Sequence, residues 1–234
     1  MQITQGKRRF NSGSRTLVHK FGENAGLAAN SFESVWSAGG VYPWSAFSSA
    51  QILYAKSSGV GSDTGNLEIQ GLDESYHIQT ETITLTNGIP VATTKEFLRV
   101  FRLRYSDTVD NAGTITVHTG SGTGTVVGQI EEGEGSSAMA LYTIPAGFTG
   151  YLVDYTISSA KGTNASVRIK CRKEGEAFQT ISFNETFQNS FRQEFPEPLV
   201  IPSKSDLDAI AKGSSSNGGL VITFNLYIEK NRVN

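Results

Sequence analysis

The chain has 234 residues with a formal net charge of −2, and aromatic residues make up 10 % of it. This length admits one large β domain or two domains of about 100 residues each, and either can bury a core without disulfides or metals. The single cysteine excludes an intrachain disulfide, and no apolar run reaches the roughly 18 residues of a membrane-spanning helix. The N-terminus lacks the apolar stretch of a secretory signal, so we expect none.

The first 22 residues are polar and basic. They hold five basic side chains and no acidic one, which leaves −7 for the remainder. The basic side chains are Lys7, Arg8, Arg9, Arg15 and Lys20. Such a segment buries too little apolar surface to fold alone, so we predict an extended arm that orders against a partner or a neighbouring subunit. A frayed, solvated terminus is the alternative. Direct nucleic-acid binding is not expected, because no basic stripe or stacking platform continues beyond the arm.

An aromatic segment follows the arm. Phe32, Trp36, Tyr42 and Trp44 surround a Gly-Gly pair and a proline that forbid a regular helix. Aromatic side chains on an irregular segment bury large areas at little entropic cost. We predict a plug over the end of a sheet or in an intersubunit seam, and a sugar-binding platform is the functional alternative. Residues 1–45 then form the arm and the plug.

Residues 46–131 alternate between short strand patterns and turn signals. Strands are predicted over 51–56, 66–71, 76–86, 97–105, 113–119 and 124–130. The Asn87-Gly88 dipeptide is typical of the turns between them, because it supplies positive φ angles. The glycine-rich acidic stretch 131–136 then interrupts the pattern, so we place a domain boundary there.

Residues 136–234 contain a second set of strand patterns. These cover 138–144, 150–158, 165–173, 177–183, 187–195, 206–212 and 219–229. Side chains alternate faces along a strand, so the apolar positions from Leu220 to Ile228 indicate a strand with one buried face. Seven or so strands over roughly 100 residues are typical of a β-sandwich. The chain is therefore predicted to be all-β, with two antiparallel β-sandwich or jelly-roll-like domains preceded by an extended N-terminal arm.

Four phenylalanines recur every four residues inside the second domain. They are Phe183, Phe187, Phe191 and Phe195. This spacing also fits one face of a helix, but the polar residues between them and the following Pro196 and Pro198 favour strands. The stripe is interpreted as part of the core, and an interface stripe at a trimer axis or a capsid contact is the alternative.

Residue types that perform chemistry are scarce. The three histidines lie far apart in the sequence, and no HExxH, CxxC or His-x-His pair is present to hold zinc. The glycine-rich stretch 120–124 lacks the Gly-Lys-Ser/Thr ending of a phosphate-binding loop. Cys171 lies on the apolar face of a predicted strand and is interpreted as an inert core residue. We therefore expect no enzyme, no metal and no cofactor.

The order of several motifs resembles that of a known family. The motifs are Phe-Glu-Ser-Val-Trp at 32–36, Gly-Gly-Val-Tyr-Pro-Trp at 39–44, and the segments 68–73, 81–85, 97–102 and 139–152. Over roughly residues 21–230 this succession resembles small virion structural proteins of tailed bacteriophages, particularly marine and cyanobacterial ones. The resemblance implies a virion protein and no catalytic residues.

Three functions compete under this resemblance. The first is a capsid decoration or cement protein, a homotrimer made in the host cytoplasm and seated on the virion, where it clamps neighbouring major capsid subunits. A basic arm, two β domains and a lack of chemistry favour this function. The second is a tail, neck or fibre-attachment component. The third is a carbohydrate-binding or host-adhesion module that uses Trp36, Tyr42 and Trp44.

Overall fold

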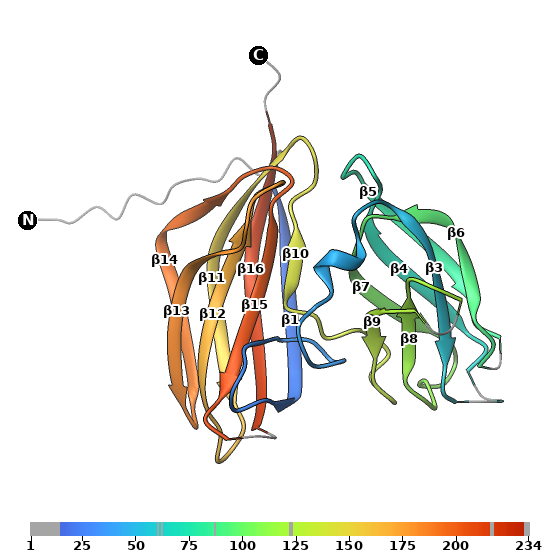
Figure 1. The fold of residues 1–234 in the computed structure, drawn as a ribbon, viewed down its shortest axis with the longest axis horizontal. Coiled ribbons are helices and arrows are strands. Elements are labelled where there is room, and N and C mark those ends of the chain that lie inside the picture. The colour runs from blue at the N-terminus through green and yellow to red at the C-terminus, as the bar shows by residue number, and fades with distance from the viewer. Residues whose placement is uncertain are drawn as a thin grey trace, which may run out of the picture.

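The structure is a computed structural model, and nearly all of its regular structure is strand. It describes residues 15–59, 61, 63–86, 88–121, 124–215 and 218–231. A short 3-10 turn, η1 (Trp44–Ala46), is the exception to the strands in these ranges. The all-β prediction is confirmed. Within the described residues no helix is long and apolar enough to cross a membrane. Figure 1 shows two lobes that lie side by side.

The larger lobe is a jelly roll made of a four-stranded and a five-stranded antiparallel sheet. One sheet has the order β1 (Arg15–Leu27), β16 (Gly218–Lys230), β11 (Phe148–Ser159), β14 (Ser190–Ile201). The other has the order β10 (Leu141–Thr143), β15 (Asp206–Gly213), β12 (Asn164–Arg172), β13 (Gln179–Phe187), and β2 (Glu33–Ser34) also pairs with β15. With β2 left out, the other eight strands of the jelly roll can be numbered 1 to 8 along the chain. The first sheet then has the order 1-8-3-6, and the second sheet has the order 2-7-4-5. This is the connectivity of a double-sheet jelly roll.

The smaller lobe is inserted between β2 and β10 of the jelly roll. Its four-stranded sheet has the order β6 (Val91–Phe97), β3 (Gln51–Ser57), β8 (Ile115–His118), β9 (Val126–Ile130). Its three-stranded sheet has the order β5 (Ile78–Thr84), β4 (Asn66–Leu72), β7 (Arg99–Ser106). A Cβ on Gly128 of β9 would lie 2.8 Å from the Leu103 side chain of β7, so the two sheets pack closely against each other there.

The alternation of apolar and polar residues in the sequence explains where β16 and β12 form. On β16 every second residue from Leu220 to Ile228 is buried between the sheets, and the residues between them are partly exposed. Val167 and Ile169 are buried on β12 in the same way, whereas Arg168 and Lys170 point to the other face. The predicted buried face from Leu220 to Ile228 is confirmed.

The predicted arm is wrong for residues 15–22. They form the first part of β1, which pairs with β16 from Arg15 opposite Glu229 to Leu27 opposite Gly218. The inward positions of β1 include Lys20, Gly22 and Asn24, which interrupt the apolar alternation between Val18 and Leu27. A Cβ on Gly22 would lie 2.2 Å from the backbones of Val35 and Ala140. The jelly roll therefore includes β1, and residues 1–14 lie outside the described residues.

Candidate functional site

The aromatic segment lies between the two lobes and bonds to both. Val35 donates its backbone N–H to Ala209 O of β15 at 2.8 Å, and Trp44 Nε1 donates to Asp208 Oδ2 at 2.8 Å. On the other side, Tyr42 Oη lies 3.3 Å from Val100 O and 3.2 Å from Val127 O in the inserted lobe. The segment therefore joins the jelly roll to the inserted lobe.

The aromatic rings of this segment pack against one another in the interior. The Tyr42 ring centre lies 5.0 Å from that of Trp36 and 4.8 Å from that of Trp44, both edge to face. Only 3 % of Trp36, 1 % of Tyr42 and 8 % of Trp44 is exposed. A sugar ring needs an accessible aromatic face, so the alternative of a sugar-binding platform on these residues is wrong. Phe32 lies apart from them, with its ring centre 4.2 Å from the Arg168 guanidinium.

A buried ion cluster lies beside the aromatic segment. Arg99 of β7 donates from Nε to Asp206 Oδ1 of β15 at 3.0 Å and from Nη2 to Oδ2 at 3.2 Å. Arg172 of β12 donates from Nε to the same Oδ2 at 3.0 Å, and Thr143 Oγ1 donates to Oδ1 at 2.6 Å. A bidentate arginine fixes orientation as well as distance. The cluster thus holds the inserted lobe in one orientation on the jelly roll.

Two further charged groups are buried in the same joint. Burial raises the pKa of Asp208 to about 6, although Trp44 Nε1 and Ser34 Oγ donate to its carboxylate. Burial, with a smaller contribution from the charge of Arg102, lowers the pKa of Lys20 to about 7. Lys20 Nζ donates to the carbonyl of Phe101 in the inserted lobe. Burial removes water from both side chains, so the charged form of each is less favourable than the neutral form.

The shifted pKa values of Asp208 and Lys20 predict a minimum in the free energy of unfolding near pH 6 to 7. Asp208 binds a proton more tightly in the folded state than at its ordinary pKa of 3.8, so stability falls as pH rises from about 4 to 6. Lys20 binds its proton less tightly than at its ordinary pKa of 10.5, so stability rises with pH above about 7. Urea unfolding at a series of pH values measures both limbs.

Lys20→Met is expected to flatten the rise above pH 7 and to leave the fall below pH 6. Asp208→Asn is expected to do the reverse. Lys161→Met, which changes an exposed lysine in a turn, is the matched control. An unchanged upper limb in Lys20→Met, or the same flattening in the control, contradicts this assignment.

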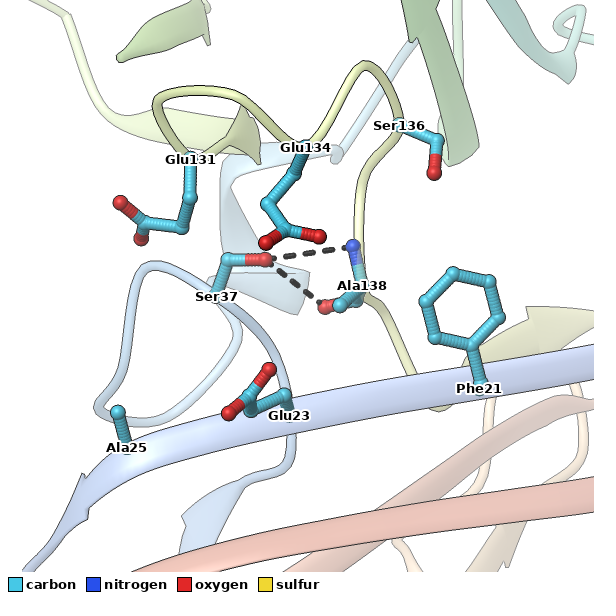
Figure 2. Close-up of a pocket in the computed structure, with 8 residues that line it drawn as sticks. All are labelled: Phe21, Glu23, Ala25, Ser37, Glu131, Glu134, Ser136 and Ala138. Atoms are coloured by element: carbon cyan, nitrogen blue, oxygen red, sulfur yellow. Dashed lines mark hydrogen bonds between the residues drawn. The ribbon is translucent and has the colours of Figure 1, made fainter.

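A cavity of about 250 Å³ opens at the joint between β1 and the β9–β10 connection (Figure 2). Its lining comprises Phe21, Glu23, Ala25, Ser37, Glu131, Glu134, Ser136 and Ala138. Ser37 Oγ donates to Ala138 O at 3.2 Å and lies 3.3 Å from the Ala138 N–H. Three carboxylates without a histidine, cysteine or lysine attract cations but provide no pair of nucleophile and base. Among the described residues no group of His, Cys, Asp and Glu is arranged to hold a metal ion.

The histidines and the cysteine lie apart in the fold. His19 Nδ1 lies 2.9 Å from Asn225 Oδ1 on the jelly roll, and His118 Nε2 lies 2.8 Å from Thr116 Oγ1 in the inserted lobe. His77 is exposed, with Nδ1 3.6 Å from Asp73 Oδ2. Burial raises the pKa of the Cys171 thiol, which makes it a poorer nucleophile.

The structure divides the phenylalanine stripe between two faces. Phe191 and Phe195 of β14 are half-buried against the core, and the Phe195 ring lies 6.0 Å from that of Tyr155. Phe183 and Phe187 of β13 face solvent, 51 % and 64 % exposed. The chain crosses from one sheet to the other between β13 and β14, so the same spacing places the two pairs on different faces.

Two of the five basic residues predicted for the arm lie in the jelly roll. Arg15 Nε pairs with Glu229 at 2.6 Å, and Lys20 is buried beneath the inserted lobe, so it is not available to a partner. Lys7, Arg8 and Arg9 lie outside the described residues. Sequence reasoning missed the ion cluster. Its signal was a pair of acids, Asp206 and Asp208, within an otherwise apolar strand.

No protein-family model matches the chain, and no curated protein matches it. Among solved structures it is similar to the insecticidal delta-endotoxin Cry8Ea1 of Bacillus thuringiensis, with a TM-score of 0.24 and 11 % identity, over 92 % of this chain and 60 % of that one. It is also similar to a structure of the Gx strain of infectious bursal disease virus, with a TM-score of 0.22 and 9 % identity, over 94 % and 78 % of the two chains. The VP2 subviral particle of the same virus gives a TM-score of 0.18 at 9 % identity, over 94 % and 77 %. At these scores the similarities carry no argument about function, and no family is assigned.

Proposed function

We propose that this protein is a non-enzymatic structural component of a tailed-bacteriophage virion, namely a capsid decoration protein that clamps neighbouring major capsid subunits. The motif order that resembles phage virion proteins supports this proposal. The joint between the lobes is the observation that carries it furthest. Arg99 and Arg172 share the buried carboxylate of Asp206, so two β bodies are held at a fixed spacing, as a clamp across adjacent subunits requires.

The surface offers contact points on both lobes. Large apolar side chains are exposed at Leu17, Phe21, Val41, Ile78, Ile89, Val109, Phe183, Phe187 and Val200. Each isolated contact of this kind is weak, but several contacts of one molecule with a common shell add through effective concentration. A homotrimer at threefold or quasi-threefold sites multiplies them further. The proposal therefore requires no deep pocket and no catalytic group.

Copy number tests the proposed position on the head. A protein that fills threefold and quasi-threefold sites is expected at a ratio near one to one with the major capsid protein, because icosahedral symmetry repeats each site over the shell. Quantitative mass spectrometry of purified virions measures this ratio, with a known tail protein as the internal control. A ratio of a few per cent contradicts the decoration role and indicates a tail, neck or fibre-attachment component. Absence from virions contradicts both.

A further inference from the structure

The outer face of the β10–β15–β12–β13 sheet carries a row of cations beside a row of aromatic rings. The charged side chains on the outward side of β12 are Arg168, Lys170 and Arg172. Phe183 of β13 lies opposite Arg168 in the ladder, and Phe187 follows four residues later on the same strand. These two rings are 51 % and 64 % exposed. Large apolar side chains on the outward side of a sheet mark a surface that binds something.

The rings and the cations contact one another at the centre of this face. The Arg168 guanidinium lies 4.2 Å from the ring centre of Phe32 and 5.7 Å from that of Phe183. The Lys212 ammonium of β15 lies 5.3 Å from the Phe32 ring centre. The two rings and the two cations therefore form one continuous patch over three strands and the segment that holds Phe32.

A second group of the same kind extends the patch along β12. The ring centre of Phe178, just before β13, lies 4.5 Å from the Arg172 guanidinium and 5.9 Å from the Lys170 ammonium. These residues come from separate chain segments between positions 32 and 212, so the linear sequence shows no basic stripe here and only the fold assembles it. We call this surface the basic-aromatic face, which comprises Phe32, Arg168, Lys170, Phe178, Phe183, Phe187 and Lys212.

Three cations of the basic-aromatic face have no acidic partner. Within the described part of the chain, Arg168, Lys170 and Lys212 form no ion pair. Glu185 is the exposed acid on the outward side of β13, where it lies 3.4 Å from Ser166 Oγ. The two acids of β15 are buried in the joint between the lobes. The face therefore carries a local excess of positive charge on a chain whose net charge is −2, and such a field attracts an anionic ligand.

We propose that the basic-aromatic face binds single-stranded nucleic acid. Each nucleotide of a single strand offers one phosphate and one base with an open π-face, and this surface offers cations next to aromatic rings. Aromatic side chains on the outward side of a sheet stack bases in the same manner in known RNA-binding domains. A duplex keeps its base faces stacked, and an acidic glycan or an acidic protein segment brings anions without a regular aromatic unit. The single strand thus matches both halves of the surface.

An open pocket of about 310 Å³ lies at one end of the basic-aromatic face. Its lining includes Phe187, Lys212, Ser166 and Asn164. The Asn164 Oδ1 atom is buried and has no hydrogen-bond partner among the described residues. A base that enters this pocket can stack on Phe187 and donate an amino hydrogen bond to an unpaired acceptor, while Lys212 pairs with its phosphate.

Fluorescence anisotropy of the full chain with a labelled oligothymidylate of about 12 nucleotides tests this proposal, since single-strand platforms cover about 4 to 16 nucleotides. Three phosphate contacts predict a slope of about −2 for the logarithm of the binding constant against that of the salt concentration. A duplex of the same length is expected to bind about tenfold more weakly, because its bases cannot stack on the rings. The inference rests on the basic-aromatic face alone and does not depend on the proposed place in a virion.

Substitutions separate stacking from charge. Phe183→Ala is expected to weaken binding about fivefold or more, the lower limit for losing one stacked base. Lys212→Gln is expected to reduce the salt slope by about 0.7, the contribution of one phosphate contact to a single strand. The matched controls are Phe21→Ala and Lys230→Gln, because both side chains are exposed on strands of the opposite sheet. Neither control is expected to change the affinity.

Several results would overturn the proposal. Absence of binding at about 100 μM protein in about 50 mM salt is one, since phosphate contacts are strongest at low salt. Equal loss of affinity in Phe183→Ala and Phe21→Ala is another. Heparin or polyglutamate that competes as well as the oligonucleotide at equal charge assigns the face to an acidic glycan or an acidic protein instead. Binding that disappears when Lys7, Arg8 and Arg9 are replaced by glutamine belongs to the N-terminal segment and not to this face.

Discussion

Replacing Asp206 with alanine is expected to lower the free energy of unfolding by about 3 to 5 kcal/mol, because it leaves a buried guanidinium without its counter-charge. Only 7 % of the Arg99 side chain is exposed, and Asp206 accepts both of its closest charged hydrogen bonds. Arg172 and Thr143 lose the same acceptor. The two lobes also lose an ion pair that joins them, so in calorimetry we expect one unfolding transition for the wild type and two for Asp206→Ala.

Equilibrium unfolding in urea measures the loss. Glu176→Ala is the matched control, since it breaks the exposed Lys173–Glu176 pair at 3.8 Å, and exposed pairs contribute about 0.5 kcal/mol or less. Asp206→Asn keeps the size of the side chain and removes only the charge, so its free energy of unfolding reports the effect of the charge alone. A loss under about 1 kcal/mol in Asp206→Ala, or an effect no larger than that of the control, would show that the cluster does not hold the joint.

Replacing Trp44 with alanine is expected to cost about 3 to 5 kcal/mol, the range for removing a large aromatic side chain from a core. The centre of its ring lies 4.8 Å from the ring centre of Tyr42 and 5.5 Å from that of Phe178. The guanidinium carbons of Arg99 and Arg172 lie 5.6 and 5.5 Å from the same ring centre. Its indole N–H is one of two donors to the Asp208 carboxylate. The substitution therefore opens a cavity and deprives a buried acid of a hydrogen bond.

Trp44→Phe separates these two effects. It keeps an aromatic ring and loses the N–H, so we expect the smaller loss of about 1 to 3 kcal/mol that accompanies an unpaired buried group. Val41→Ala changes an exposed residue of the same segment and should stay within about 0.5 kcal/mol. Thermal and urea unfolding report all three variants. Equal losses in Trp44→Ala and Val41→Ala would contradict a structural role for the aromatic segment.

The sequence by itself was sufficient to predict those strands whose inward positions are apolar. Strand β16 follows the predicted alternation from Leu220 to Ile228, because periodicity reports directly which face of a strand is buried. Strand β6 was missed between the predicted strands 76–86 and 97–105. Its buried position Thr93 is polar and donates its hydroxyl to the Lys95 carbonyl, so no apolar alternation marks this strand.

Only the tertiary structure decided which strands are neighbours. Strand β1 pairs with β16 across 214 residues of sequence, and its inward Lys20, Gly22 and Asn24 fit there because the inserted lobe covers the lysine and the backbones of Val35 and Ala140 leave no room for a Cβ at the glycine. The pairing of distant strands also determines the Arg99–Asp206–Arg172 cluster and the division of the phenylalanine stripe between two sheets. A local pattern tells which side chains seek the interior, but the partners that they meet depend on how distant strands are brought together, and those contacts form only in the complete fold.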